Sequence, residues 1–507
     1  MWAILHSVLG DGPATRHHRA GGNLMFALAC AAVPVLGAII LLIAPRQRDA
    51  AAKPILILCA AIVLVVAVAT TATRPAGSVT YLGGQYFVLD ATSALFLSLI
   101  AIVFFGISIY ARKQLSNGSS KSRDGMVVVR ALFFFASCVL TVLCNHLVAM
   151  WVLLEVGTLT IAPLIFFNRG PVALRASWKY LKFSVLGLGF NLVGLMCLAR
   201  GMGGAHGEHT VTFFLDELQT LFTLGEQIWW ELGLALMVFG LGTKLGLAPM
   251  YAWLPDAYDE APPVVTTMLA AVQFNCVLLF LFRQVGLLRS FDPDLVSFEL
   301  IAMGVLSIAI SSFHIVRVDN YKRLIAYASI NHAGTIAVGL GMGKNAAYGV
   351  ILYVVSNALV KSVLFLTCGN IKDHYGTKQI ASLRGLIRVM PFSGWVFMLG
   401  TFALLGFAPF GSFLGEIIIL SNMAEGGYLF LFLFLCVMLT INLVATGRAL
   451  FPMIWGDTPG DEVEVKEPVW SIASSAFYIL VLVSLGIYTP EPVTSLFREV
   501  AATLDGK

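Results

Sequence analysis

The sequence predicts an all-α polytopic membrane protein with about fourteen transmembrane helices. Of its 507 residues, 58% are hydrophobic and only 12% are charged, whereas soluble domains carry roughly a quarter charged residues. The hydrophobic residues are grouped in runs of about 20, the length that an α-helix needs to cross a bilayer. We expect spans at residues 23–44, 54–73, 91–111, 126–144, 147–167, 177–200, 229–254, 263–285, 296–316, 323–342, 346–370, 391–421, 427–452 and 469–488.

Three segments lie outside these predicted spans. Residues 1–22 are mostly polar, with a basic cluster at 16–19. A signal peptide has a short apolar core after its basic residues, but a full-length span follows here, so we expect an interfacial helix or a later start at Met25. The alternation in Ser78–Asp90 predicts a short extended hairpin outside the membrane. The connection 201–225 is polar and carries histidine and acidic residues.

Lysine and arginine residues gather in every second connection between the spans. The positive-inside rule places such connections in the cytoplasm. The odd-numbered connections are therefore predicted to be cytoplasmic, and both termini to face outward across a bacterial cytoplasmic membrane, with Arg16 and Arg19 as exceptions to the pattern. The basic residues of these connections are Arg46, Arg48, Lys53, Arg112, Lys113, Lys121, Arg123, Arg169, Arg175, Arg317, Lys322, Arg323, Lys372, Lys378, Arg384 and Arg388.

Several classes of site are not expected. The eight cysteines lie mostly inside apolar segments and form no C-x-x-C pair, so the sequence predicts no zinc or iron–sulfur site. There is no Gly-rich phosphate loop after a strand, and no basic region strong enough for nucleic acid. We therefore expect no cofactor in this chain and no nucleic-acid partner.

Two predicted spans carry helix-breaking residues in a matching pattern. Span 7 contains Lys244 followed by Gly246-Leu-Ala-Pro249, and span 12 contains Gly406-Phe-Ala-Pro409 followed by Glu416. Proline removes a backbone donor and clashes with the preceding turn. Paired interrupted helices in two halves of a membrane protein indicate a transport pathway, so helices 7 and 12 are predicted to be broken.

Ionisable residues inside the predicted spans are the candidate site. Each costs about 2.5–3.5 kcal/mol at the centre of a membrane helix on insertion scales, so several in one chain indicate a shared function. A coupled Glu155–Lys244 pair would let protonation of one group displace a proton from the other. We expect protons to hop laterally between these groups; the alternative is a cation site in which Glu155 or Glu416 binds Na⁺. The candidate relay residues are Glu155, Lys244, His332, Lys361 and Glu416.

The chain resembles the proton-translocating antiporter-like subunits of complex I, Mrp antiporters and membrane-bound hydrogenases, from about Thr92 to Phe451. Within that group it is most similar to the hydrogenase-4 component F branch. The motifs that carry the resemblance are Trp151-x-x-x-Glu155; Lys244-x-Gly246-Leu-Ala-Pro249-x-x-x-Trp253-Leu-Pro-Asp256-Ala-x-x-x-Glu260-Ala-Pro262; Lys322-Arg323-x-x-Ala326-Tyr327-x-Ser329-Ile-x-His332; Asn357-Ala-x-x-Lys361-Ser362-x-Leu-Phe; and, for the hydrogenase branch, Tyr375-Gly376-Thr377 through Pro391.

The resemblance implies a fourteen-helix core with two inverted five-helix repeats. The corresponding regions are a polar segment at 1–22, N-terminal helices at 23–125, repeats at 126–285 and 296–452, and a C-terminal helix and tail at 453–507. It also implies that Glu155 and Lys244 form the input pair, and that Lys361 and Glu416 lead toward the output. Asn275 stands where several relatives have a lysine, and Asn331 where an acid is expected.

Four functions follow as hypotheses. The first is a proton-translocating membrane subunit of an energy-converting hydrogenase or NADH-dehydrogenase-like complex, without a redox centre of its own. The second is a Na⁺/proton antiporter subunit, and the third is a proton-driven membrane subunit of an inorganic-carbon uptake complex. The fourth is a non-conducting anchor. The first three imply other membrane subunits and a soluble redox or uptake partner.

Overall fold

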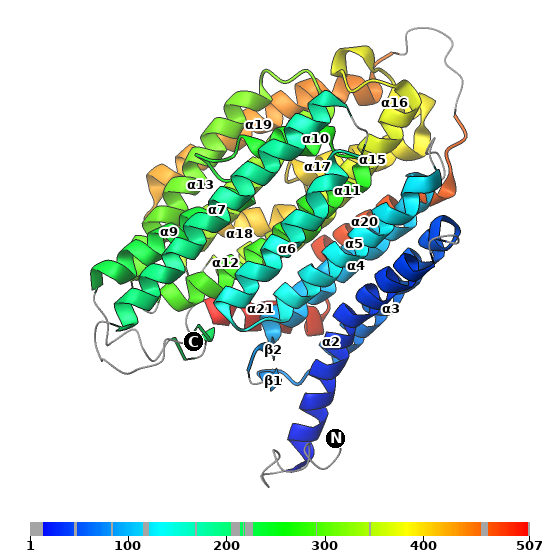
Figure 1. Ribbon diagram of the computed structural model, residues 1–507. Coiled ribbons are helices and arrows are strands. Elements are labelled where there is room, and N and C mark those ends of the chain that lie inside the picture. Colours follow the sequence, from blue (N-terminus) through cyan, green and yellow to red (C-terminus); the bar gives the residue numbers. More distant parts are fainter. Residues whose placement is uncertain are drawn as a thin grey trace.

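The computed structural model describes residues 14–44, 48–82, 85–114, 121–167, 170–203, 213–215, 217–218, 227–289, 292–343, 346–457 and 465–504. These residues form a bundle of long helices with one small β-hairpin at one end (Figure 1). The elements are α2 (Ala14–Ile43), α3 (Arg48–Thr73), β1 (Thr80–Leu82), β2 (Phe87–Leu89), α4 (Ala91–Gln114), α5 (Lys121–Leu143), α6 (Leu147–Ile165), α7 (Pro171–Gly203), α9 (Gln227–Leu245), α10 (Trp253–Glu260), α11 (Pro263–Thr267), the π-helical turn η2 (Met268–Gln273), α12 (Phe274–Arg289), α13 (Pro293–Ile315), α14 (Tyr321–Met342), α15 (Ala347–Tyr375), the 3₁₀ turn η3 (Ile380–Ser382), α16 (Leu386–Val389), α17 (Pro391–Leu404), α18 (Gly411–Glu425), α19 (Leu429–Trp455), α20 (Val469–Ile487) and α21 (Glu491–Leu504).

The predicted helical membrane class is confirmed. Within the described residues, thirteen helices are long and apolar enough to cross a membrane. The remaining predicted span, 391–421, consists of the two shorter helices α17 and α18. The predicted span 229–254 is also shorter as a continuous helix, because α9 ends at Leu245. The predicted connection 201–225 and the segment 1–13 lie largely or wholly outside the described residues.

The predicted hairpin between the second and third spans is confirmed. Strands β1 and β2 pair antiparallel, with Thr80 opposite Leu89. The hairpin is tied to the α5–α6 connection, because Phe87 bridges to Cys144 and the backbone N–H of Asn145 donates to the carbonyl of Tyr86 at 2.8 Å. The described start of α2, the hairpin and α21 lie at one end of the bundle, and α16 lies at the other (Figure 1).

Burial separates central helices from peripheral ones. In the most apolar windows of α14, α15 and the segment formed by α11, η2 and α12, all residues are buried, whereas in α19 only 17% are. In a bilayer, α19 therefore faces lipid or another subunit along most of its surface. Three of the polar residues discussed below, Lys361, His332 and Gln273, lie on the central elements α15, α14 and η2.

Helix α21 is a C-terminal element that the hydrophobic runs did not predict. It packs against α4 and α15 through the buried side chains of Phe497, Val500 and Leu504. Its Glu499 carboxylate forms an ion pair with Arg74 at 2.5 Å. The helix thereby closes the end of the bundle that carries the hairpin.

Candidate functional site

The backbone is interrupted at both Gly-x-Ala-Pro sequences. Helix α9 ends at Leu245 and α10 begins at Trp253, and α17 ends at Leu404 and α18 begins at Gly411. The first glycine of each sequence has a positive φ, +79° at Gly246 and +67° at Gly406. This left-handed backbone favours glycine, which has no Cβ to clash with the carbonyl. The peptide bonds before Pro249 and Pro409 are cis.

Polar groups satisfy the backbone freed at the first interruption. The N–H of Ala248 donates to the Ser307 hydroxyl at 2.8 Å, and the indole N–H of Trp253 donates to the carbonyl of Thr243 at 2.9 Å. Buried backbone groups need such partners, above all in a membrane where no solvent can supply them. Trp253 of the sequence motif is thus part of the scaffold that holds Lys244 at the end of α9.

At the second interruption, the freed backbone contacts the candidate residues directly. The Ser412 hydroxyl donates to the carbonyl of Ala403 at 2.7 Å, and the carbonyl of Leu404 lies 3.1 Å from Nε2 of His332. A Cβ on Gly406 would collide with a carboxylate oxygen of Glu416. The backbone conformation at Gly406 therefore favours glycine, and a larger residue there would displace the Glu416 carboxylate.

Lys244 on α9 contacts α6 one turn away from Glu155. The ammonium of Lys244 is buried and donates to the hydroxyl of Thr158, one turn after Glu155 on α6. Glu155 interacts with Lys244 electrostatically, and its Oε2 is buried without a hydrogen-bond partner. Thr158 in turn donates to the carbonyl of Leu154 at 2.8 Å, which leaves its oxygen free to accept from Lys244.

A tyrosine–glutamine pair continues from this cluster toward the centre of the bundle. The Lys244 ammonium lies 5.9 Å from the ring centroid of Tyr180 on α7. The Tyr180 hydroxyl is fully buried and donates to Oε1 of Gln273 at 2.8 Å. Gln273 is the last residue of the π-helical turn η2, and its Nε2 is buried without a partner. π-Helical turns frequently occur at functional sites.

Lys361 lies on the far side of the same turn. Its ammonium is 3.8 Å from the ring centroid of Phe274, the residue after Gln273. A cation over an aromatic face is attracted by the negative face of the ring. Lys361 is 1% exposed, and its Nζ has no hydrogen-bond partner among the residues that the structure describes. Each lysine is thus next to an aromatic ring, Tyr180 for Lys244 and Phe274 for Lys361, and these two rings are linked through Gln273, which accepts from Tyr180 and precedes Phe274.

His332 links Lys361 to the second interruption. Its Nδ1 lies 3.1 Å from Oδ1 of Asn357, one turn before Lys361 on α15, and its Nε2 lies 3.1 Å from the Leu404 carbonyl. Lys361 also interacts with His332 electrostatically. Because both facing atoms are oxygens, the ring satisfies both hydrogen bonds when each nitrogen carries a proton.

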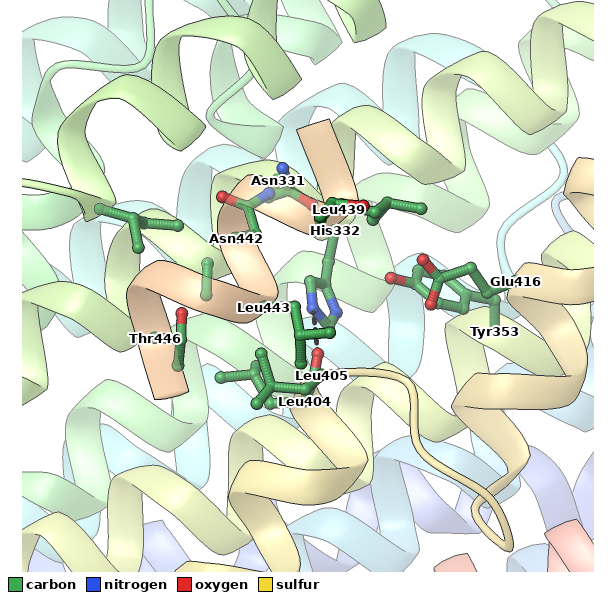
Figure 2. Close-up of a pocket in the computed structure, with 13 residues that line it drawn as sticks. Asn331, His332, Tyr353, Leu404, Leu405, Glu416, Leu439, Asn442, Leu443 and Thr446 are labelled. Carbon is green, nitrogen blue, oxygen red and sulfur yellow. Dashed lines mark hydrogen bonds between the residues drawn. The ribbon is translucent and has the colours of Figure 1, made fainter. Parts of the chain in front are cut away.

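Glu416 lines a cavity beside His332 and Tyr353. The rings of His332 and Tyr353 are 5.4 Å apart, and Glu416 interacts electrostatically with Tyr353. Figure 2 shows Glu416 and Tyr353 on one side of the His332 ring, and Asn442 and Thr446 of α19 on the other. The cavity has a volume of about 160 Å³. Among the candidate relay residues, Glu416 is the last acid along the chain, and it lines this cavity.

Asn275 differs from Gln273 in that its side-chain amide donates to the carbonyl of Ala271 on its own helix, at 2.5 Å. Its Oδ1 has no hydrogen-bond partner among the described residues. The site thus includes Thr158, Tyr180, Gln273, Tyr353 and Asn357, which the sequence analysis did not single out as site residues. The sequence offers no signal that singles out Gln273, because Asn275 and Gln284 are also amides within the apolar run of span 8.

An ion-pair network covers one end of the first interruption. The Asp256 carboxylate pairs with Lys179 at 2.6 Å and with Arg323. Asp259 pairs with Lys378 at 2.7 Å and also accepts from the amide of Asn320 at 3.1 Å. The acidic residues of the Trp253–Glu260 motif therefore attach α10 to α7, to α14 and to the connection after α15.

Comparison with known proteins identifies the family of this chain. Residues 144–441 match the family model described as NADH:quinone oxidoreductase/Mrp antiporter, TM. The chain is 27% identical over 436 residues to the Hydrogenase-4 component F homolog of Methylacidiphilum infernorum (isolate V4), a match that covers 83% of this chain and 89% of the relative. It is 25% identical over 412 residues to a putative antiporter subunit of Staphylococcus aureus (strain MRSA252), covering 80% of each chain.

Solved structures share the fold. A chain of the membrane-bound sulfane sulfur reductase, an archaeal respiratory membrane complex, superposes with a TM-score of 0.84 at 23% identity, over 94% of this chain and 97% of that one. A chain of the Mrp complex from Dietzia sp. DQ12-45-1b gives a TM-score of 0.82 at 21% identity, over 94% and 97%. Because the family model covers more than half of the sequence, this protein belongs to the NADH:quinone oxidoreductase/Mrp antiporter membrane family, as an antiporter-like multi-pass subunit.

Proposed function

We propose that this chain is the proton-translocating membrane subunit of an energy-converting, hydrogenase- or NADH-dehydrogenase-like complex. The observation that carries the proposal is a series of buried polar and ionisable side chains in the middle of the bundle, in which Phe274 lies beside Lys361. The series comprises Glu155 and Lys244, then Tyr180 and Gln273, then Lys361, His332 and Glu416. In a membrane protein, ionisable residues that face the bundle interior mark ion or proton pathways.

The first half of the series can exchange protons at two charged groups. Lys244 is held by a neutral hydroxyl, with Glu155 acting on it through space, so a proton arriving on Glu155 removes the attraction that holds the charge on Lys244. The Tyr180 oxygen would take up the proton released by Lys244 while the Tyr180 hydroxyl proton moves to Oε1 of Gln273. The Tyr180 hydroxyl and the Gln273 amide are neutral at ordinary pH. They can carry a proton along their hydrogen bond but do not hold a charge between transfers.

The second half contains a switchable hydrogen bond. A fully protonated His332 donates to Asn357 Oδ1 and to the Leu404 carbonyl. When the ring has lost a proton, rotation of the Asn357 amide would present Nδ2, which has no other partner, as a donor to the ring. Either protonation state of His332 can therefore be satisfied at this position, as a proton carrier between Lys361 and Glu416 requires.

The experiment uses the purified native complex in proteoliposomes. A potassium gradient with valinomycin sets the membrane potential, and an internal pH dye reports proton flux. We expect flux with the wild type and loss of flux with Glu155→Gln and Lys244→Ala in complexes of unchanged subunit composition. Glu425→Gln, which changes an exposed acid at the end of α18, is the matched control. Flux in Glu155→Gln equal to the wild type would contradict the proposal.

A Na⁺/proton antiporter subunit is the second candidate. It is favoured by the similarity to a putative antiporter subunit and to an Mrp complex. A series of flux measurements with Na⁺ or choline as the external cation separates the two functions. Flux that depends on Na⁺ supports antiport, and flux that is equal in both salts supports the hydrogenase-like function.

The partner and the orientation belong to the same proposal. We place the chain in a bacterial cytoplasmic membrane with both termini outside, next to other membrane subunits and a soluble redox arm. Gentle detergent purification of the native complex, followed by mass spectrometry and metal analysis, tests this. Nickel or iron with soluble hydrogenase-like subunits is expected, and membrane subunits alone would instead support antiport.

A further inference from the structure

A groove lies along α19 at the end of the bundle that carries the basic connections. Helix α19 packs beside α13, η3 and α16 at the edge of the bundle (Figure 1). The groove is lined by Ile315 at the end of α13, by Arg384 after η3, and by α19 from Thr440 to Pro452. Its volume is about 670 Å³, within the usual range of roughly 300–1,000 Å³ for small-molecule sites. The groove can therefore hold part of a ligand at the edge of the membrane.

The wall of the groove toward the bilayer is apolar. Val316, Ile441 and Val444 line the groove, and all three side chains are exposed. In a bilayer, apolar side chains on the outer surface of a helix bundle lie at the level of the hydrocarbon core. An acyl chain of a lipid can therefore enter the groove from this side.

Three charged side chains line the polar part of the groove. They are Arg448 of α19, Arg384, and Asp319 in the connection between α13 and α14. Within the part of the chain that the structure describes, none of the three takes part in an ion pair. Nη1 of Arg384 donates to the carbonyl of Leu383 at 3.1 Å, which holds the guanidinium at the wall. The groove thus offers two guanidinium groups and one carboxylate to a ligand.

Arg448 lies within a membrane helix and not in a connection. It precedes Trp455, the last residue of α19, by about two turns, or roughly 10 Å along the helix. Tryptophan is enriched at the membrane–water interface, and Trp455 is exposed, so Arg448 lies deeper in the bilayer than this interface. A charged side chain at such a depth needs a partner. The guanidinium fork can bind a phosphate group through two parallel hydrogen bonds.

We propose that the groove binds a phospholipid whose headgroup carries both a phosphate and a primary amine, as in phosphatidylethanolamine. The phosphate lies between Arg384 and Arg448, and the ammonium lies beside Asp319. One acyl chain follows α19 along Ile441 and Val444 into the bilayer. Basic pockets between membrane helices on the cytoplasmic side bind lipid headgroups. Lipid binding at this groove does not depend on the proposed function.

The charges of the groove select this headgroup over an anionic one. Phosphatidylglycerol has a phosphate but no cation, so its negative charge would lie near the Asp319 carboxylate without compensation. Like charges at close range repel, and they do so more strongly in apolar surroundings. An acidic side chain of a neighbouring subunit would meet the same repulsion. An ammonium beside Asp319 replaces the repulsion with an attraction.

Photo-crosslinking of lipid to the native complex tests the site. The purified complex is placed in nanodiscs of phosphatidylcholine that contain a few per cent of a probe lipid with a diazirine in one acyl chain. The probe carries either an ethanolamine or a glycerol headgroup. Mass spectrometry locates the label, which is expressed relative to the total label on the chain. We expect label on Val316 and on residues 441–449, about fivefold more with the ethanolamine probe, as one partly exposed ion pair would give.

Substitutions of the charged residues separate their roles. Arg384→Gln and Arg448→Gln should each lower the label from the ethanolamine probe at least about tenfold, because each removes a charged partner of the phosphate. Arg448→Lys keeps the charge and should retain more label than Arg448→Gln. Asp319→Asn should abolish the preference for the ethanolamine probe. Arg388→Gln is the matched control, because Arg388 is exposed at the same end, pairs with Asp457 and does not line the groove; its label should equal that of the wild type.

Three results would overturn the site. Equal label from the two probes in the wild type would rule out selection by the amine. Unchanged label in both Arg384→Gln and Arg448→Gln would rule out phosphate binding by the arginines. A groove without lipid label, together with a link from Val444→Cys to another subunit through a bifunctional thiol reagent, would assign the groove to a protein partner. Native gels confirm assembly of each variant, and since no proton flux is measured, these results leave the proposed function untouched.

Discussion

The Tyr180 hydroxyl donates to Oε1 of Gln273 at 2.8 Å and thereby joins α7 to the π-helical turn η2. Both side chains are buried, at 0% and 5% exposure. The Lys244 ammonium lies 5.9 Å from the Tyr180 ring, and the Lys361 ammonium lies 3.8 Å from the ring of Phe274, the residue after Gln273.

Tyr180→Phe should therefore divide the relay into two halves. The substitution keeps the ring and removes the hydroxyl, which leaves the Gln273 amide without its partner. A barrier raised by about 1.4 kcal/mol slows a step about tenfold, and we expect at least this reduction in proton flux. Loss of the buried hydrogen bond should lower the free energy of unfolding by about 1–3 kcal/mol. Flux in proteoliposomes and thermal unfolding of the purified complex measure the two effects.

Tyr478→Phe is the control for this prediction. Tyr478 is also fully buried, and its hydroxyl donates to the carbonyl of Val103 at 2.5 Å, away from the charged series. It should show a comparable loss of stability with flux retained. If both variants lost flux equally, the effect of Tyr180→Phe would be one of packing and not of proton transfer.

Two substitutions of His332 should distinguish its role as a proton carrier from its role as a hydrogen-bonding group. His332→Gln retains a polar group that can reach Asn357 or the Leu404 carbonyl but cannot take up a proton, so flux should fall at least about tenfold, a barrier increase of about 1.4 kcal/mol. His332→Leu leaves both oxygens unpaired and should in addition cost about 1–3 kcal/mol for each of them. Normal flux in an assembled His332→Gln complex would remove His332 from the relay.

Gly406→Ala should damage the site through the Glu416 carboxylate. The added Cβ would contact the Glu416 carboxylate oxygen. The alanine would also have to keep the left-handed backbone at φ +67°, which costs roughly 1–2 kcal/mol. Gly376→Ala provides the same backbone cost at φ +68° with no atom within 4 Å of the added Cβ. We expect similar stability changes in thermal unfolding but loss of proton flux in Gly406→Ala alone. Equal flux in the two variants would show that the position of Glu416 is unimportant.

Asp90 should make stability depend on pH at the end of the bundle that carries the hairpin. Burial alone would raise the pKa of Asp90, but Arg283, at 3.3 Å, and hydrogen bonds from Ser93 outweigh it, so the pKa is lowered from its ordinary value of 3.8. A lowered pKa in the folded protein means that the ionised group stabilises above its unfolded pKa, and that this contribution is lost as pH falls through the folded value.

Asp90→Asn should lower the free energy of unfolding by about 3 kcal/mol at neutral pH, because it leaves the Arg283 guanidinium without its counter-ion. The difference from the wild type should begin to shrink as pH falls below 3.8, where aspartate in the unfolded chain takes up a proton, and it should vanish only below the lower pKa of Asp90 in the folded protein. Thermal unfolding of the purified protein between pH 7 and pH 3 measures this. A difference that stays constant with pH would contradict the role of the charge.

The sequence by itself determined the class of the protein and the order of its spans, and it named the charged residues of the candidate site. Runs of about 20 apolar residues have one stable form in a bilayer, because every backbone group must be satisfied within the segment. The hairpin at 80–89, the positions of Gly246 and Gly406, and the residues Glu155, Lys244, His332, Lys361 and Glu416 could all be named in advance, since a charge or a helix breaker in an apolar run stands out from its neighbours.

The tertiary structure alone decided what joins these residues. Tyr180 and Gln273 are 93 positions apart, and neither is unusual in a buried helix until the 2.8 Å hydrogen bond joins them. The contact of His332 with the Leu404 carbonyl exists because α14 packs against the interrupted end of α17. Hydrophobic periodicity fixes which segments are buried, but it is non-directional. The choice of neighbours for each buried polar group depends on how the helices pack.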